Sequence, residues 1–324
     1  MPSLNPPVKL FSAALVLGTL FHSGFAPESQ AADQSADALR SGRFKWTASE
    51  PLLSPASRPD DPCYSVKDPS IVRFDNRWHL FCTIRGQKRT HQIEYLSFDD
   101  WTNANAAIRH ILAVTNGYFC APQVFYFEPH QKWYMIYQAS DKARKVALQP
   151  VFSTSTNITN PQSWSTPLFL YPAHPENVEG WIDFWVICDD TKAHLFFTSN
   201  NGKMWRAETK LVNFPYGWSQ PEVVLRGDIF EASHTYRLKG RNEFLTVIEA
   251  MGSGGRRYYK AYLADKLDGD WKPLAATAEQ PFANPRAPQA THGPTPTATA
   301  NCFAPDTIRS WKSMPQSWNS SFRA

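Results

Sequence analysis

Tryptophan-led turns recur along this chain as Trp46-Thr47-Ala48-Ser49-Glu50-Pro51, Trp164-Ser165-Thr166-Pro167, Trp218-Ser219-Gln220-Pro221 and Trp271-Lys272-Pro273. With Trp101 they form a series of five tryptophans at intervals of 55, 63, 54 and 53 residues. A period near 50 residues, with about four short strands in each unit, is typical of propeller blades. The repeat therefore predicts five blades. A β-sandwich with accidental tryptophan spacing is the alternative, and it is disfavoured because the intervals are so regular.

Short apolar runs between these turns predict β-strands. They are four to seven residues long, rich in aromatic and β-branched types, and bounded by Asp, Asn, Gly or Pro. Examples are the runs 70–74, 78–82, 124–127, 132–137, 194–198 and 243–248. Residues 75–76, 200–202 and 239–242 are typical of hairpin turns. Sustained helical periodicity is hard to find, so the fold class is all-β.

A distinctive segment follows each of four tryptophans by 13 to 22 residues. These segments are Lys67-Asp68-Pro69-Ser70, Ala121-Pro122-Gln123, Trp181-Ile182-Asp183-Phe184-Trp185 and Phe230-Glu231-Ala232-Ser233. The innermost strand of every propeller blade lines the central channel, so Asp68, Asp183 and Glu231 should converge there. Bringing three carboxylates together is costly, because like charges repel and burial raises their pKa values. Proteins accept this cost mainly where function uses it.

The convergent carboxylates favour acid–base hydrolysis of a glycosidic bond. One carboxylic acid protonates the leaving oxygen and one carboxylate activates water or attacks, while a third helps to keep the acid protonated. Aromatic residues near the channel offer stacking faces for a sugar: Tyr118, Phe119, Trp181 and Trp185. In the alternative interpretation, Asp68 caps a turn before Pro69 and Glu231 pairs with an arginine.

Composition narrows the classes of partner. The 324 residues carry 33 basic and 29 acidic side chains, a formal net charge of +4, with 14% aromatic residues and 19% charged ones. This much apolar surface excludes wholesale disorder, and the small charge without a basic run argues against nucleic acid. Low charge and many aromatics favour an uncharged ligand such as carbohydrate. We expect a monomer.

The N-terminus predicts export. Lys9 precedes the apolar run 10–21, and small residues near position 26 suit signal-peptide cleavage. The run is too short for a membrane span, so no membrane partner is expected. The domains are a signal peptide at 1–26, a polar linker at 27–42, a propeller at 43–284 and a tail at 285–324, and the location is secreted or periplasmic. The five cysteines (Cys63, Cys82, Cys120, Cys188 and Cys302) follow no metal spacing, and their pairing stays open.

From Phe44 to about Phe282 the sequence resembles glycoside hydrolase family 62, the α-L-arabinofuranosidases acting on arabinoxylan. The matching stretches are FKWT (44–47), KDPSIVR (67–73), APQVFYF (121–127), WIDFWVICDD (181–190), FEASHTYRLKG (230–240) and GGRRYYKAYLAD (254–265). Families 43 and 32 share the five-bladed propeller but not WIDFW followed by FEAS.

The resemblance implies an inverting mechanism with three assigned carboxylates. Asp68 matches the general base, Glu231 the general acid, and Asp183 the carboxylate that tunes the pKa of the acid. Three further positions match residues that hold arabinose hydroxyls in the family: Lys67, Gln123 and Arg256. Arg257 is the alternative to Arg256. We also expect Trp185 to take part in substrate binding. No cofactor is required for the chemistry, and no metal ligand is assigned.

The resemblance stops after Phe282. The family continues with a fifth inner strand containing Ser-His-Gly-Glu, whose histidine lies beside a structural calcium, whereas residues 285–324 are rich in Pro, Thr and Ala without strand periodicity. Reading the message one nucleotide later after Gly293 can encode the missing segment, so we suspect a frameshift, and His292 is not that calcium ligand. The fifth blade should then be incomplete, the tail disordered and the activity of this chain impaired.

Two other functions stay open at this stage. One is a carbohydrate-binding propeller without turnover, which the altered C-terminus favours. The other is a family 43-type arabinanase or xylosidase, which would cut unbranched arabinan or xylo-oligosaccharides.

Overall fold

The computed structural model describes residues 39–44, 46 and 51–284, and these form four antiparallel sheets of four strands. Blade 1 consists of β1 (Cys63–Phe74), β2 (Arg77–Gly86), β3 (Thr90–Phe98) and β4 (Arg109–Ile111); blade 2 of β5 (Phe119–Phe127), β6 (Lys132–Ser140), β7 (Leu148–Ser155) and β8 (Leu168–Phe169). Blade 3 consists of β9 (Ile182–Cys188), β10 (Lys192–Thr198), β11 (Lys203–Lys210) and β12 (Glu222–Arg226); blade 4 of β13 (Glu231–Arg237), β14 (Phe244–Ala250), β15 (Tyr258–Ala264) and β16 (Lys272–Ala275). Short 3-10 turns lie at η1 (Trp101–Ala106), η2 (Glu128–His130), η3 (Leu211–Asn213) and η4 (Ser253–Gly255).

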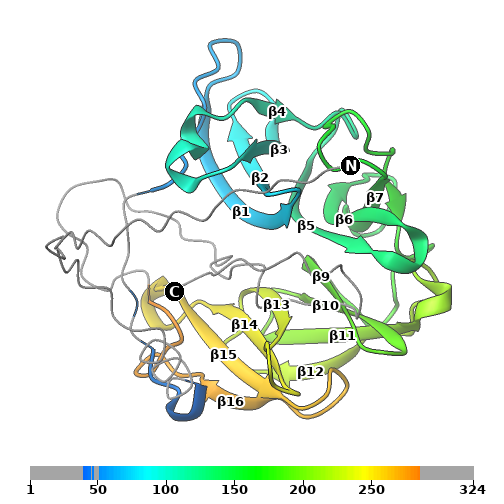
Figure 1. Cartoon of the computed structure of the whole chain (residues 1–324). Coiled ribbons are helices and arrows are strands. Elements are labelled where there is room, and N and C mark those ends of the chain that lie inside the picture. The colour runs from blue at the N-terminus through cyan, green and yellow to red at the C-terminus, as the bar shows by residue number, and fades with distance from the viewer. Residues whose placement is uncertain (1–38, 45, 47–50, 285–324) are drawn as a thin grey trace, which may run out of the picture.

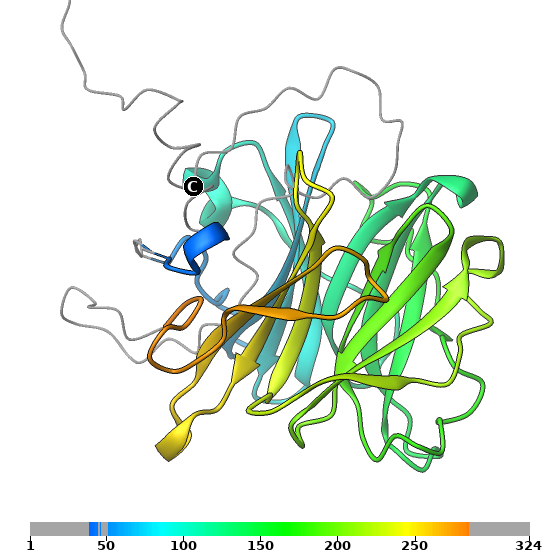
Figure 2. The ribbon, with the colours of Figure 1, turned by 90° about the horizontal axis from the view of Figure 1, so that it is seen from below.

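The four blades are arranged around a common centre, with the first strand of each blade innermost (Figure 1). Strand β1 contacts β5, β5 contacts β9, and β9 contacts β13, so the chain passes from blade to blade in sequence order. The β2–β3 and β14–β15 hairpins project from the same face of the molecule (Figure 2). The all-β propeller is thus confirmed. Four blades are described, and the tail 285–324, where the fifth inner strand was sought, lies outside the described residues.

The strand and turn predictions agree with these elements. Each of the six apolar runs lies within or overlaps one strand of blades 1 to 4. Asp75 and Asn76 join β1 to β2 with φ of 49° and 56°, the left-handed geometry that matches strand twist in a tight hairpin. Gly240, with φ of 75°, lies in the turn between β13 and β14. No helix in the part of the chain that the structure describes is long and apolar enough to cross a membrane.

The repeated tryptophans lie between the third and fourth strand of each blade, and two of them pack on the preceding blade. Trp164 of blade 2 meets Phe81 of β2 edge to face, with 5.6 Å between ring centroids. Trp271 of blade 4 meets Phe196 of β10 in the same way at 5.8 Å. Edge-to-face packing adds about 0.5–1.5 kcal/mol beyond area burial. The spacing seen in the sequence is therefore the spacing of a contact between blades.

Hydrophobic clusters fill the spaces between neighbouring blades. Blades 1 and 2 share a cluster around Phe81, Tyr95 and Tyr137. Blades 2 and 3 share one around Tyr134 and Phe197. Each of these two clusters takes side chains from two sheets, so neighbouring blades bury apolar surface against each other, which is the usual condition in repeat architectures.

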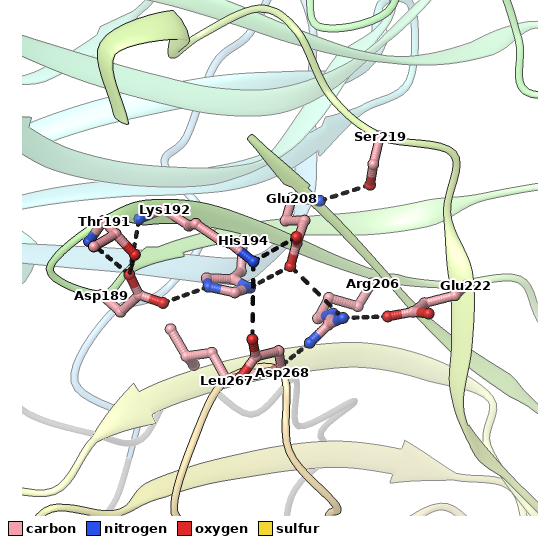
Figure 3. A network of polar contacts seen from close by, with 10 residues as sticks. All are labelled: Asp189, Thr191, Lys192, His194, Arg206, Glu208, Ser219, Glu222, Leu267 and Asp268. Atoms are coloured by element: carbon pink, nitrogen blue, oxygen red, sulfur yellow. Dashed lines mark hydrogen bonds and ion pairs between the residues drawn. The ribbon is translucent and has the colours of Figure 1, made fainter. Parts of the chain in front are cut away.

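A polar network adds to the junction between blades 3 and 4 (Figure 3). Lys192 lies between Glu208 on β11, at 2.6 Å, and Asp268 in the turn before β16, at 3.9 Å. The buried guanidinium of Arg206 donates to the carbonyl of Leu267 at 3.3 Å. These contacts fix β10 and β11, the middle strands of blade 3, against the β15–β16 turn.

The N-terminal segment 39–44 packs on blade 4. Leu39 and Phe44 join the cluster around Phe282, and the Gln280 amide donates to the carbonyl of Gly42 at 3.0 Å. Gly42 has φ of 66°, and a Cβ there would lie 1.9 Å from the Leu274 carbonyl oxygen. The linker predicted at 27–42 is therefore too long at its end, because residues 39–42 are part of the packed domain.

We expect Trp164→Ala to lower the free energy of unfolding by about 3–5 kcal/mol, because it removes a buried aromatic ring from the contact between two blades. Urea denaturation followed by tryptophan fluorescence measures the change. Val212→Ala is the control, since Val212 is 86% exposed and its truncation should change stability by less than about 0.5 kcal/mol. Equal stability of the Trp164 variant and the wild type would contradict the assigned contact.

Candidate active site

Each innermost strand contains the same β-bulge. Two residues of the inner strand lie opposite one residue of its neighbour: Asp68 and Pro69 opposite Cys82, Ala121 and Pro122 opposite Tyr137, Asp183 and Phe184 opposite Phe197, and Ala232 and Ser233 opposite Ile248. The first residue of each bulge is left-handed, with φ of 50° at Asp68, 53° at Ala121, 56° at Asp183 and 58° at Ala232. Bulges of this kind re-aim side chains and are frequent beside active sites.

The bulges define equivalent positions in the four inner strands, and they refine the sequence alignment. Asp68 and Asp183 occupy the left-handed position itself, where aspartate is one of the few tolerated side chains. Glu231 lies one residue earlier, in register with Lys67 of β1. Gln123 lies two residues after the left-handed Ala121, so it is not equivalent to any of the three carboxylates.

Asp183 is the most perturbed of the three carboxyl groups. Burial, together with the negative charges of Asp68 and Glu231, raises its pKa to about 8. The backbone amide of Ala232 on the next blade donates to the Asp183 carboxylate at 3.0 Å and opposes this rise only in part. These interactions bring carboxylates from β1, β9 and β13 into one electrostatic group, so the structure places the three predicted residues together on inner strands.

Lys67 supplies a positive charge beside the predicted base. Its ammonium nitrogen lies 3.7 Å from the Asp68 carboxylate. Burial opposes the charged form of the lysine, but the nearby carboxylates outweigh it and raise the pKa of Lys67. The positive charge of Lys67 therefore persists in the site, beside the Asp68 carboxylate.

The pKa of Glu231 is set by two opposing effects, burial and a nearby arginine. Burial raises its pKa, while the guanidinium of Arg257, 3.6 Å away, and Lys67 act against the rise. The alternative interpretation that Glu231 pairs with an arginine thus holds as a contact. Of the two candidate arginines, Arg256 is exposed at the end of η4, whereas Arg257 contacts Glu231. The part of either arginine in sugar binding stays a prediction.

Two predicted substrate-binding residues have structural partners. The Gln123 amide donates to the Val186 carbonyl at 2.7 Å and accepts from the Val186 amide at 2.6 Å, which ties β5 to β9. Trp185 is 8% exposed, donates to the Thr235 carbonyl at 2.7 Å and stacks on His234. Their part in sugar binding stays a prediction, and each has most of its polar or aromatic surface already engaged.

The aromatic residues expected to stack on a sugar fall into two groups, those buried in the core and one that lies at the site. Phe119 and Trp181 are buried in the clusters between blades, with 0% and 3% exposure, so they are core residues rather than sugar platforms. Tyr118 lies at the site, where its hydroxyl accepts from the Cys120 thiol at 3.1 Å. Sequence alone did not separate these cases, because aromatic residues serve both purposes.

Glu249 is a site residue that the sequence reasoning missed. It lies on β14 directly opposite Glu231 on β13, with a side chain 1% exposed. Its carboxylate is 3.1 Å from the same Arg257 nitrogen that approaches Glu231. The signal was present: one acidic residue in the otherwise apolar or hydroxyl-bearing run Phe244–Ala250. A buried charge of this kind requires a partner.

No metal centre is formed by the described residues, since no three His, Cys, Asp or Glu side chains are grouped to hold an ion. The calcium implied by the family resemblance depends on a histidine segment sought beyond residue 284, which lies outside the described residues. Four cysteines (Cys63, Cys82, Cys120 and Cys188) are free thiols in the described part of the chain.

Carboxylates on the inner strands of an all-β propeller define the class of protein as a glycoside hydrolase. The sequence model of glycosyl hydrolase family 62 matches residues 45–300, and the chain belongs to this family. It is 37% identical over 248 residues to alpha-L-arabinofuranosidase C of Cellvibrio japonicus. That match covers 74% of this chain, and the chain spans about 37% of the length of that relative.

Solved structures agree with this assignment. The catalytic domain of a family 62 α-L-arabinofuranosidase from Coprinopsis cinerea superposes with a TM-score of 0.69 and 35% identity, over 75% of this chain and 78% of that one. A family 62 hydrolase in complex with xylotriose gives a TM-score of 0.69 and 33% identity, over 75% and 79% of the two chains.

Asp183→Asn should stabilise the protein increasingly as the pH rises. The pKa of Asp183 is about 8 in the folded protein, against 3.8 for an unperturbed aspartate. Between these two pH values the folded state binds one proton that the unfolded state does not, so the free energy of unfolding falls as the pH rises through this range. Asparagine removes this loss. We expect the melting temperature of the variant to match that of the wild type near pH 4 and to exceed it by about 2–6 °C near pH 8.5.

Differential scanning calorimetry across this pH range tests the expectation. Asp190→Asn is the matched control, because Asp190 is exposed and its substitution should give the same small difference at every pH. A stability difference for Asp183→Asn that does not change with pH would show that Asp183 titrates normally.

Proposed function

We propose that this protein is an inverting α-L-arabinofuranosidase that releases arabinofuranosyl side groups from arabinoxylan. One observation carries the proposal: Asp68 and Asp183 stand on the bulges of two inner strands, Glu231 stands one residue before the bulge of a third, and their charges act on one another. The names of two relatives support the substrate class, since one is called an α-L-arabinofuranosidase and another was solved with xylotriose.

Each carboxyl group has an environment suited to one step. Asp68, beside the Lys67 ammonium, would take a proton from the attacking water. Glu231, whose pKa is raised by burial, would donate its proton to the xylose oxygen as the glycosidic bond breaks. Asp183 would orient the arabinose and modulate the acid. Inversion requires room for water, so we expect the base and acid about 6.5–9.5 Å apart with substrate bound.

We also propose that the propeller has a fifth blade, which is incomplete in this chain, and that the protein is exported. The packing of Trp46 supports the fifth blade: it meets Phe282 edge to face, at 5.2 Å between ring centroids, as Trp164 meets Phe81. Its indole donates to the Phe282 carbonyl at 2.5 Å. Trp46 would then be the blade 5 member of the tryptophan series. The apolar run 10–21 supports export.

Glu231→Gln and Asp68→Asn should each reduce arabinose release from arabinoxylan by about 10²- to 10⁴-fold, because each removes one proton-transfer step. A 4-nitrophenyl arabinofuranoside separates the two roles. Its leaving group needs little protonation, so Glu231→Gln should retain more activity on it than on arabinoxylan, whereas Asp68→Asn should lose both. Liberated arabinose is measured by chromatography.

Glu243→Gln is the control for these variants, since Glu243 pairs with Arg241 in the β13–β14 turn, outside the carboxylate group. Sugar binding without any arabinose release by the wild type would favour the non-catalytic propeller. Cleavage of unbranched arabinan or xylo-oligosaccharides would favour the family 43-type activity.

A chain with the reading frame restored after Gly293 should melt at least about 5 °C higher than the present chain and release more arabinose, because a closed ring pairs the exposed strand edges. Scanning calorimetry and arabinose assays on both chains test this. Gene sequencing through this region provides an independent check. Equal melting temperatures and equal activities would refute both the frameshift and the role assigned to the missing strand.

A further inference from the structure

Glu249 has no part in the mechanism above, yet it is the most enclosed carboxylate near the site. Its side chain is 1% exposed, and it faces Glu231 directly across the β13–β14 pair. Adjacent like charges on neighbouring strands destabilise a sheet. The pair is therefore tolerated only if a cation or a shared proton neutralises it.

Arg257 is the cation that both carboxylates share. Its Nη1 lies 3.1 Å from Oε1 of Glu249 and 3.6 Å from Oε2 of Glu231. The guanidinium carbon lies 4.6 Å from the ring centre of Phe230, which holds the group over the start of β13. The arginine is thus fixed between two carboxylates and lies closer to the buried one.

This arrangement addresses a conflict in the acid step. A guanidinium that acted on Glu231 alone would favour its ionised form, whereas a general acid must hold a proton when the substrate arrives. We propose that Glu249 is a positioning residue of the acid, which engages Arg257 in an ion pair and thereby leaves the proton on Glu231. The inference rests on the proposed function, because it assigns Glu249 a part in the acid step of that reaction.

The surrounding charges show how the proton can be shared. Burial raises the pKa of Glu249 to about 7, Arg257 opposes the rise, and the charges of Glu231 and Asp68 add to it. Glu231 is faced by Arg257, Lys67, Asp68 and the amide of Asn200, and it interacts with Asp183. On β15, Tyr259 lies opposite Glu249. The two glutamates therefore titrate as a coupled pair and can share a proton.

Substrate binding would shift that proton towards Glu231. Glu231 is 26% exposed and loses its remaining water when a sugar covers it, whereas Glu249 is already buried and loses none. Desolvation disfavours the charged form of the newly covered group. The negative charge then settles on Glu249, 3.1 Å from Arg257, and the proton on the residue that faces the leaving oxygen.

Glu249→Gln tests the inference by a readout that does not require turnover. The titration of Glu231 is followed by NMR on full-length protein labelled with ¹³C at glutamate carboxyl groups, and its signal is assigned by its loss in Glu231→Gln. With a neutral residue at 249, Arg257 acts on Glu231 alone. We expect the midpoint of Glu231 to fall by about one pH unit, and the alkaline limb of kcat/KM on arabinoxylan to move with it.

Two further variants separate this effect from general damage. Glu249→Gln combined with Arg257→Gln removes the uncompensated cation and should return the midpoint of Glu231 to near the wild-type value or above it. Glu249→Asp keeps the charge and should leave the midpoint within about 0.3 pH unit, which guards against misfolding of the glutamine variant. Glu243→Gln, which removes a carboxylate from a different arginine pair, should change nothing.

An unchanged Glu231 midpoint in Glu249→Gln would overturn the inference. So would a lowered midpoint that the second substitution at Arg257 does not restore. A wild type that releases no arabinose would instead overturn the proposed function. In that case the titrations would still decide whether Glu249 controls the proton of Glu231.

Discussion

The repeated bulge of the inner strands is the constraint on which the site depends. In a regular strand successive side chains alternate between faces, so neighbouring residues cannot both approach the channel. The extra residue breaks this alternation at one level in all four described blades. A left-handed residue other than glycine costs about 1–3 kcal/mol. The regular ladders on both sides of each bulge offset that strain.

Charge balance at the centre follows from this geometry. Four carboxylates and two cations share the site: Asp68, Asp183, Glu231 and Glu249 against Lys67 and Arg257. Full ionisation would leave two uncompensated negative charges in a partly buried space, which favours protonation of carboxyl groups in this cluster. The raised pKa values of Asp183 and of the two glutamates express this balance. The arrangement of the inner strands thus favours protonated carboxyl groups, because it buries several carboxylates close to one another.

Much of this was predictable from the sequence, and the remainder was not for identifiable reasons. Strand runs and the tryptophan period report local pattern and blade spacing, so the fold and the carboxylates at 68, 183 and 231 followed from them. A bulge changes register without a distinctive sequence pattern, so Gln123 was aligned with residues it does not match. Arg256 and Arg257 are adjacent in a glycine-rich loop, where spacing does not decide direction. Glu249 was overlooked because pairing across strands, rather than motif, brings it to the site.

The one-residue offset between the proposed acid and the proposed base has a chemical consequence. Asp68 stands on the left-handed residue of its bulge, whereas Glu231 stands one position earlier and has a side chain longer by one methylene. Strand residues are spaced about 3.3 Å apart, so the two carboxylates start from different levels of the channel. A base set back from the acid leaves space on the far side of the sugar ring for a water molecule, as the proposed inversion requires. The same offset puts Glu231, and not Asp68, in register with the β14 position that Glu249 occupies, which is why the arginine-bound partner belongs to the acid.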